Sequence, residues 1–213
     1  MRVLPKNISD FLYLISKIRL SFFRGLLLKP FFAKNSHFPF IDKNTTLIFK
    51  HKITFGKFVW LGKNGYLDAC SKNGVVFGNN STIRENFVIQ CRSGLNEKGH
   101  SLIVGKETFI GPFCKIGVGG PIVIGNDCQF GSHCSLNAES HISFQDSYTS
   151  GHVSRQGIFI GNNVWVGDGV IILDGVTIGD NCVIGAGSLV NKSLPKNSLA
   201  FGVPAKVQKK LKN

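Results

Sequence analysis

The chain has 213 residues, a length that fits one compact domain with terminal extensions, or two small domains at most. Apolar residues make up 43% of the chain and charged residues 17%, so global disorder is excluded. Glycine accounts for 25 residues and proline for only 7, without a strict Gly-X-Y period, so collagen is excluded as well.

The net charge of +13 is concentrated at the two ends of the chain. Residues 1–57 contain eleven basic and two acidic residues, and residues 192–213 contain six lysines and no acidic residue. Net charge alone does not choose between nucleic acid, anionic lipid and a phosphorylated small molecule. The basic ends lack a recognisable nucleic-acid-reading module, so we expect no nucleic-acid partner.

Near the N-terminus, bulky apolar residues alternate with basic ones from Phe11 to Phe32. This pattern predicts a short amphipathic helix, which either lies in a membrane interface or covers the end of the protein's own core. Lys17, Arg19 and Arg24 interrupt the apolar runs, so we expect neither a membrane-spanning helix nor a cleavable signal peptide. The six cysteines form no C-x-x-C pair, which favours reduced thiols and a cytoplasmic protein, free or peripheral on the cytoplasmic membrane face.

The C-terminal half shows a period of six residues, which neither a helix nor a simple strand has. A glycine directly follows most of the aliphatic residues that set this period, which are Ile160, Val166, Ile172, Ile178, Ile184 and Val190. Such hexapeptide repeats are typical of parallel β-helices. Each repeat forms a short strand and a turn, three repeats form one triangular coil, and successive coils stack ~4.8 Å apart through parallel ladders.

The same phase recurs upstream to about Phe55, which predicts an all-β domain over residues 53–194. Residues 1–52 are then a basic N-terminal cap and residues 195–213 a basic C-terminal tail. The repeat lapses over residues 91–103 and 143–159, and loops that leave a solenoid often carry its sites. Four cysteines fall in the small inward position of the repeat and are expected to serve packing alone: Cys114, Cys128, Cys134 and Cys182.

The run from Gly157 to Val207, which begins GIFIGNNVWVGDGV and ends AFGVPAKV, resembles the C-terminal signature of the left-handed β-helix hexapeptide-repeat acyltransferases. It is most similar to bacterial sugar O-acetyltransferases of capsule, exopolysaccharide and O-antigen pathways. The resemblance implies the left hand of the helix, a homotrimer, and acetyl-CoA bound between neighbouring subunits without a metal.

By the same resemblance, the general base is His141, in the run AESHISFQD. A sugar hydroxyl keeps its proton at neutral pH, so its attack on a thioester needs a base of this kind. Asp146, Glu139 or a main-chain carbonyl could hold the imidazole in one tautomer. His133 and His152 remain alternative bases.

Trp165 is the second candidate in the reacting centre, either donating its indole N–H to the developing oxyanion or packing on the pantetheine arm. Trp165 and His141 each stand five residues after a repeat aliphatic, so we expect both to line one external groove. The resemblance places the coenzyme contacts at Trp165, Gly167, Asp168, Ala186, Asn191, Lys192 and Lys206. The two lysines would meet phosphate oxygens as compact charges.

The leading hypothesis is therefore an acetyl-CoA-dependent O-acetyltransferase acting on a sugar hydroxyl in bacterial surface polysaccharide biosynthesis. N-acetylation of a nucleotide-linked amino sugar or of a small xenobiotic is the first alternative, and a non-catalytic solenoid scaffold is the second. Zinc-dependent hydration, as in the γ-type carbonic anhydrases, needs three imidazoles around the metal. The spacing of the histidines does not supply that pattern.

Overall fold

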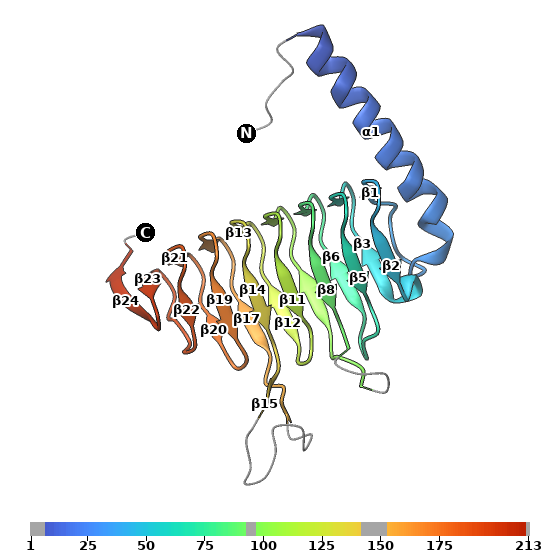
Figure 1. Cartoon of the computed structure of the whole chain (residues 1–213). Helices are drawn as coiled ribbons and strands as arrows, with labels where there is room; N and C mark the ends of the chain where they lie inside the picture. Colours follow the sequence, from blue (N-terminus) through green and yellow to red (C-terminus); the bar gives the residue numbers. More distant parts are fainter. Residues whose placement is uncertain (1–6, 93–96, 142–152, 212–213) are drawn as a thin grey trace.

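Most strands of the chain are two or three residues long, and each pairs with the strand one coil later, as the six-residue period predicts. The structure is a computed structural model, and it describes residues 7–92, 97–141 and 153–211. The coils stack into a triangular prism with the N-terminal helix α1 (Ile8–Leu28) at one end (Figure 1). The predicted all-β, left-handed parallel β-helix is confirmed.

The prism has three flat sides, here called A, B and C in the order in which the chain visits them. Side A contains β1 (Phe40–Ile41), β4 (Trp60–Leu61), β7 (Thr82–Ile83), β10 (Phe109–Ile110), β13 (Gln129–Phe130), β18 (Trp165–Val166), β21 (Val183–Ile184), β23 (Ser198–Gly202) and β24 (Ala205–Lys210). Side B contains β2 (Thr46–Ile48), β5 (Tyr66–Asp68), β8 (Val88–Gln90), β11 (Lys115–Gly117), β14 (Ser135–Asn137), β19 (Ile171–Leu173) and β22 (Leu189–Val190). Side C contains β3 (Ile53–Phe55), β6 (Val75–Phe77), β9 (Leu102–Val104), β12 (Ile122–Ile124), β17 (Ile158–Ile160) and β20 (Thr177–Ile178).

The core is a column of aliphatic and aromatic side chains from all three sides. In β3, β6, β12 and their neighbours the first and third residues point inward and the second outward, and Phe55 stacks on Phe77 with ring centroids 5.3 Å apart. The four cysteines expected to serve packing are buried, which confirms that interpretation. Burial raises the pKa of Cys91 to about 12, with a further contribution from the charge of Asp68, so this thiol stays protonated at neutral pH.

The edges between the sides need residues in the left-handed backbone region, which asparagine and glycine adopt most readily. Along the A/B edge, Asn44, Asn64 and Asn86 all have φ between +55 and +59°. Their side chains form a ladder in which each Nδ2 donates to the next Oδ1. On this edge, the stacked asparagines link each coil to the next.

The solenoid extends beyond the residues expected to form it at both ends. Strands β1 and β2 pair in parallel with β4 and β5, although both lie within residues 1–52. Ile41 and Leu47 continue the six-residue phase, but the corner that follows β2 holds Phe49 at φ +55° instead of a glycine, so the repeat is hard to recognise. At the other end, β23 extends the parallel ladder of side A and then folds back on β24 as an antiparallel hairpin.

Helix α1 is joined to the first coil by the short 3₁₀ helix η1 (Lys29–Phe31), and a second one, η2 (Lys50–Lys52), follows β2. Among the residues that the structure describes, no helix combines the length and apolar character needed to cross a bilayer.

Both interruptions of the repeat leave the prism between sides B and C. One lies between β8 and β9. The other begins after Asn137 and includes the antiparallel pair β15 (Ser140–His141) and β16 (Val153–Ser154). Figure 1 shows both excursions emerging from the same lower edge, two coils apart. The irregular segments are therefore gathered at one edge of an otherwise regular rod.

A matched pair of glycine substitutions tests the tightness of the stacked edges. A Cβ at Gly125 would lie 2.4 Å from the carbonyl oxygen of Gly161, whereas a Cβ at Gly117 would meet its nearest atom at 3.7 Å. We expect Gly125→Ala to cost roughly 1 to 3 kcal/mol of unfolding free energy in a urea titration, because backbone must move to admit the methyl group. Gly117→Ala should lie within the scatter of the wild type, and equal costs for both would contradict this account of the edge.

Candidate active site

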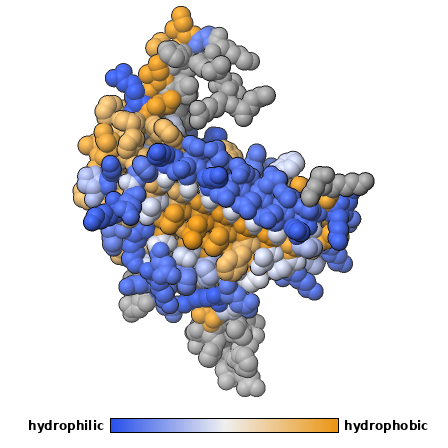
Figure 2. Space-filling model, turned by 180° about the vertical axis from the view of Figure 1, so that it is seen from behind, coloured by the Kyte–Doolittle hydropathy of each residue, from blue (hydrophilic) through white to orange (hydrophobic). Residues whose placement is uncertain are grey.

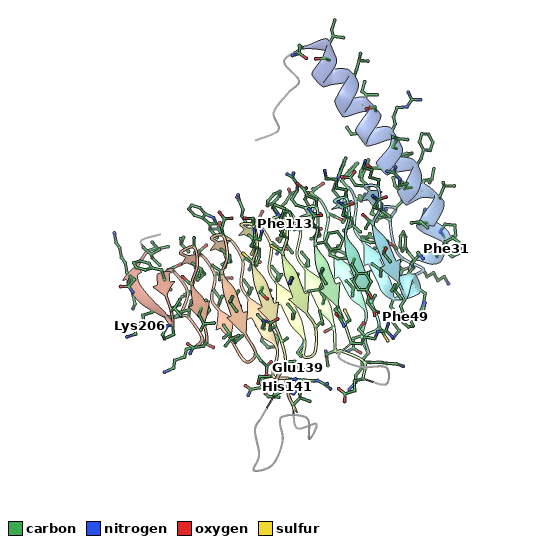
Figure 3. The ribbon with its side chains drawn as sticks, viewed as in Figure 1. Phe31, Phe49, Phe113, Glu139, His141 and Lys206 are labelled. Atoms are coloured by element: carbon green, nitrogen blue, oxygen red, sulfur yellow. The ribbon has the colours of Figure 1, made fainter. Side chains whose placement is uncertain are left out.

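His141 ends β15, the strand that leads the second excursion away from the B/C edge, and its side chain is exposed. Its backbone pairs with Val153 across the antiparallel ladder. Figure 3 shows Glu139 and His141 close together where the excursion leaves the prism. The predicted base therefore stands outside the wall of the prism, at the start of a projecting segment.

Arg155 ties this segment to the other excursion. Its Nε lies 2.6 Å from Oε2 of Glu139, and its Nη2 donates to Oε2 of Glu97. These two hydrogen bonds raise the pKa of Arg155 above its ordinary value, and the bond to Glu97 contributes more than the bond to Glu139. A charge-assisted pair of this kind is among the stronger side-chain contacts, so it helps to hold the strand that carries His141.

A cavity of about 240 Å³ opens on the B/C edge between the two excursions. It is lined by Gln90, Arg92, Gly117, Val118, Gly119, Asn137 and Glu139. An ion pair holds Arg92 in place, because its Nε lies 2.6 Å from Oδ2 of the buried Asp68. The lining combines amide, guanidinium and carboxylate groups, which can exchange hydrogen bonds with hydroxyl groups.

Trp165 lies on side A, in β18, and its indole is 59% exposed. Gly167 and Asp168 follow Trp165 at the A/B edge, and Ala186 occupies the corresponding corner one coil later. The two coils are close here, since a Cβ added to Gly167 would lie 2.6 Å from the amide nitrogen of Ala186. The Oδ1 of Asp168 accepts hydrogen bonds from the backbone N–H and the hydroxyl of Ser132, at 2.5 and 3.0 Å. These bonds, with a smaller contribution from His133, hold the pKa of Asp168 below its usual value.

Beyond Asp168, the A/B edge is formed by small residues. Gly169 and Gly187 occupy its corners at φ +67° and +68°, and a Cβ at Gly187 would meet no atom within 4 Å. The structure thus brings Trp165 and the small residues at 167, 169, 186 and 187 onto one continuous strip. Asn191 and Lys192 are exposed directly after β22, at the B/C edge of the last coil, and so do not lie on this strip. Lys206 is exposed on the side A strand β24, opposite Phe201 (Figure 3).

Phe113, which was not among the expected site residues, forms an aromatic pair with the alternative base His133 on the same A/B edge. Phe113 and His133 stack with centroids 4.8 Å apart and ring planes 11° from parallel, and both side chains are exposed. Both residues have φ near +60°, a conformation that bulky residues rarely adopt. The signal was present in the sequence, since the equivalent corners of earlier coils hold asparagine, but it appears only when residues are aligned by coil.

The two halves of the predicted site do not meet within one chain. Trp165 belongs to side A, whereas His141 leaves the B/C edge, which is the corner of the triangle opposite side A. Within one chain, Trp165 and His141 therefore do not share a groove, and the expected external groove can contain both only where two copies meet. Asp146 and His152, the proposed orienting carboxylate and an alternative base, lie outside the described residues. Within residues 7–92, 97–141 and 153–211, no three His, Cys, Asp or Glu side chains are grouped so that they could hold a metal ion.

Comparison with known proteins agrees with this architecture. Residues 157–192 match the family model described as bacterial transferase hexapeptide (six repeats). No curated protein matches the chain.

Solved structures with a similar fold include AntD, an N-acyltransferase from Bacillus cereus in complex with dTDP and 3-hydroxybutyryl-CoA, with a TM-score of 0.57, 20% identity and coverage of 90% of each chain. A hexapeptide-repeat containing acetyltransferase from Vibrio cholerae has a TM-score of 0.52 and 22% identity, over 91% of this chain and 82% of that one. The polySia specific acetyltransferase NeuO has a TM-score of 0.51 and 24% identity, over 81% and 86%. The chain thus carries the bacterial transferase hexapeptide repeat on a left-handed parallel β-helix, which confirms the resemblance seen in its sequence.

Proposed function

We propose that the protein transfers acetyl from acetyl-CoA to a hydroxyl of a sugar in bacterial surface polysaccharide biosynthesis, in the cytoplasm, with His141 as the general base. The observation that carries the proposal is the division of the site between the B/C edge and the opposite side of the prism. Two such halves make one site only when neighbouring copies bring different edges together. The active unit is therefore a homotrimer with its active sites between subunits.

The A/B edge suits the coenzyme. Gly167, Ala186 and Gly187 leave the backbone accessible, so that a pantetheine arm can lie against main-chain amides without meeting side chains. Trp165 offers an exposed indole at the start of this strip. Lys192 and Lys206 bring positive charge to the C-terminal end of the prism, where the phosphates of the coenzyme would lie.

The B/C edge suits a saccharide. Gln90 and Asn137 present amide groups to the cavity beside the strand that carries His141, and amides both donate to and accept from hydroxyl groups. Arg92, held by its ion pair with Asp68, adds guanidinium N–H donors for sugar oxygens. The name of the similar polySia specific acetyltransferase supports an acceptor of this kind.

The chemistry follows from these positions. Acetyl-CoA supplies an acetyl group already activated as a thioester. His141 removes the proton of the sugar hydroxyl as its oxygen attacks the acetyl carbon, and then returns that proton to the departing sulfur. The N–H of Trp165 stabilises the negative charge that develops on the carbonyl oxygen. The products are the sugar ester and free CoA, so each acetyl transferred releases one thiol.

Side C supplies a surface for contact between copies. The outward residues Val76, Ile103, Val123 and Phe159 stand in register on successive strands. Figure 2 shows the resulting apolar band along the middle of the prism, between rows of hydrophilic residues. Continuous apolar strips of this kind favour subunit contacts, because association removes them from water.

Acylation of an amino group is the second candidate, because the similar AntD is described as an N-acyltransferase and was solved with dTDP. The coenzyme strip would serve an amine acceptor equally well. An acceptor screen with hydroxyl-only sugars and with free amino sugars separates the two. A non-catalytic scaffold would release no thiol with any acceptor.

Replacing His141 by Ala should lower kcat by roughly 10²- to 10⁴-fold, because the hydroxyl loses its base. The measurement is acceptor-dependent release of CoA thiol. His141 is exposed, so the melting temperature should not change and a folding defect cannot mimic the loss. His133→Ala is the informative comparison, since unchanged turnover in His141→Ala together with loss in His133→Ala would move the base to the A/B edge.

A complementation experiment tests the shared site directly. Ala186→Trp should block the coenzyme strip, and His141→Ala removes the base, so each variant alone should be inactive. Random mixing of the two in one trimer leaves about one quarter of the interfaces with a wild-type base facing a wild-type strip, so co-expression should restore about a quarter of the activity. Co-purified mixed trimers without activity would show that one chain supplies both halves.

A further inference from the structure

Helix α1 is apolar on two opposite faces, and only one of them packs on the prism. The packed face includes Ser21 and Gly25, which are buried, and Phe22, whose ring lies edge-on to Phe38 with centroids 5.0 Å apart. The Ser21 hydroxyl donates to Oδ1 of the buried Asp42 at 2.5 Å, and Gly25 lies so close to Pro39 that no Cβ would fit. This face fixes the helix on the first coil.

The opposite face consists of large apolar side chains exposed to solvent. At 100° per residue these positions fall within one third of the helix circumference, on the side away from Ser21 and Gly25. They are Ile8, Leu12, Leu20, Phe23, Leu26 and Leu27, between 42 and 78% exposed. Phe31, in η1, continues the face and is 61% exposed. We call these seven residues the outer face of α1.

Basic residues predominate around the outer face. From Ile8 to Glu85 the sequence contains twelve basic residues and four acidic ones, Asp10, Asp42, Asp68 and Glu85. Asp42 and Asp68 are buried and hydrogen-bonded inside the protein, and Glu85 forms an ion pair with Arg84. Arg19 lies within the outer face, and Lys29 lies exposed beside Phe31. The N-terminal end of the prism therefore presents exposed apolar side chains with basic residues around them.

We propose that the outer face of α1 lies in the surface of an anionic bilayer. Apolar side chains enter the boundary between headgroups and acyl chains, and the basic residues around them meet lipid phosphates. A second copy of the chain fits this face less well, since it would bring a second set of unneutralised bases against the first.

The helix therefore lies on the membrane rather than across it. Figure 1 shows α1 rising from the N-terminal end of the prism, with its N-terminal half clear of the coils, so a flat surface can reach it. This docking is independent of the chemistry proposed above. It also places the prism with its N-terminal coils toward the lipid and its C-terminal coils away from it.

The test is co-sedimentation of the full-length protein with vesicles of phosphatidylglycerol and, separately, of phosphatidylcholine. We expect binding to the anionic vesicles that weakens as salt is raised, because salt screens the lysines and arginines. The double variant Phe23→Ser/Leu27→Ser should need roughly tenfold more lipid for half-maximal binding, because two inserted side chains are lost. Val203→Ser removes a side chain that is 72% exposed at the other end of the prism and should bind like the wild type.

A second variant separates charge from folding. Arg19→Glu keeps every apolar side chain and should weaken binding to anionic vesicles specifically. Equal melting temperatures for all variants exclude unfolding as the cause. The proposal is overturned if the wild type does not sediment with anionic vesicles, or if the double variant binds them undiminished. A double variant that instead changes the oligomeric state, measured by light scattering, would assign the outer face to a second copy.

Discussion

The structure depends on one constraint, the requirement that each coil repeat the path of the coil before it. Parallel ladders fix the register of neighbouring coils, so an inward aliphatic such as Ile110 has Phe130 and then Val166 above it on the same side. A residue that does not fit the six-residue period cannot be absorbed within a flat side, because it would turn every later side chain around. Extra residues therefore leave at the edges, and chemistry is confined to edges as well.

This constraint explains how much of the fold could be predicted from the sequence. The period between Ile160 and Val190 predicts the coils, the buried cysteines and the places where the ladder is interrupted. It fails at the first coil, where β2 is followed by Phe49 in the left-handed region and then by the 3₁₀ helix η2, so the sequence predicts a cap there. Whether a side chain points inward or outward depends on neighbouring residues in the strand, so it can be predicted from the sequence. The residue type at a corner is less informative, because contacts with the stacked coils can hold an unfavourable residue in the left-handed conformation.

The sequence indicates which residues of the candidate site point outward, but not how these residues are arranged relative to one another. A period of six tells whether a side chain points outward, but three repeats complete a coil, so only a count of eighteen tells which side it occupies. Leu136 lies on side B and Ile160 on side C, so the residues five positions after each lead to different edges. The contacts of Arg155 with Glu97 and Glu139 were beyond reach for another reason, because they join two excursions whose lengths obey no period. Phe113 and His133 would have emerged from an alignment by coil.

The charge of the chain also has a simple structural meaning. Residues 58–191 contain eight basic and ten acidic residues, so the excess of positive charge belongs to the two ends of the rod and not to its walls. A stack of seven coils separates these ends by roughly 30 Å, because successive coils rise ~4.8 Å. The two basic regions cannot serve a single ligand across that distance. One is suited to the phosphates of a coenzyme beside Lys192 and Lys206, the other to a surface of lipid phosphates beneath the outer face of α1. A rigid rod between them would fix the distance of the later coils from the lipid surface, so the number of coils sets that distance.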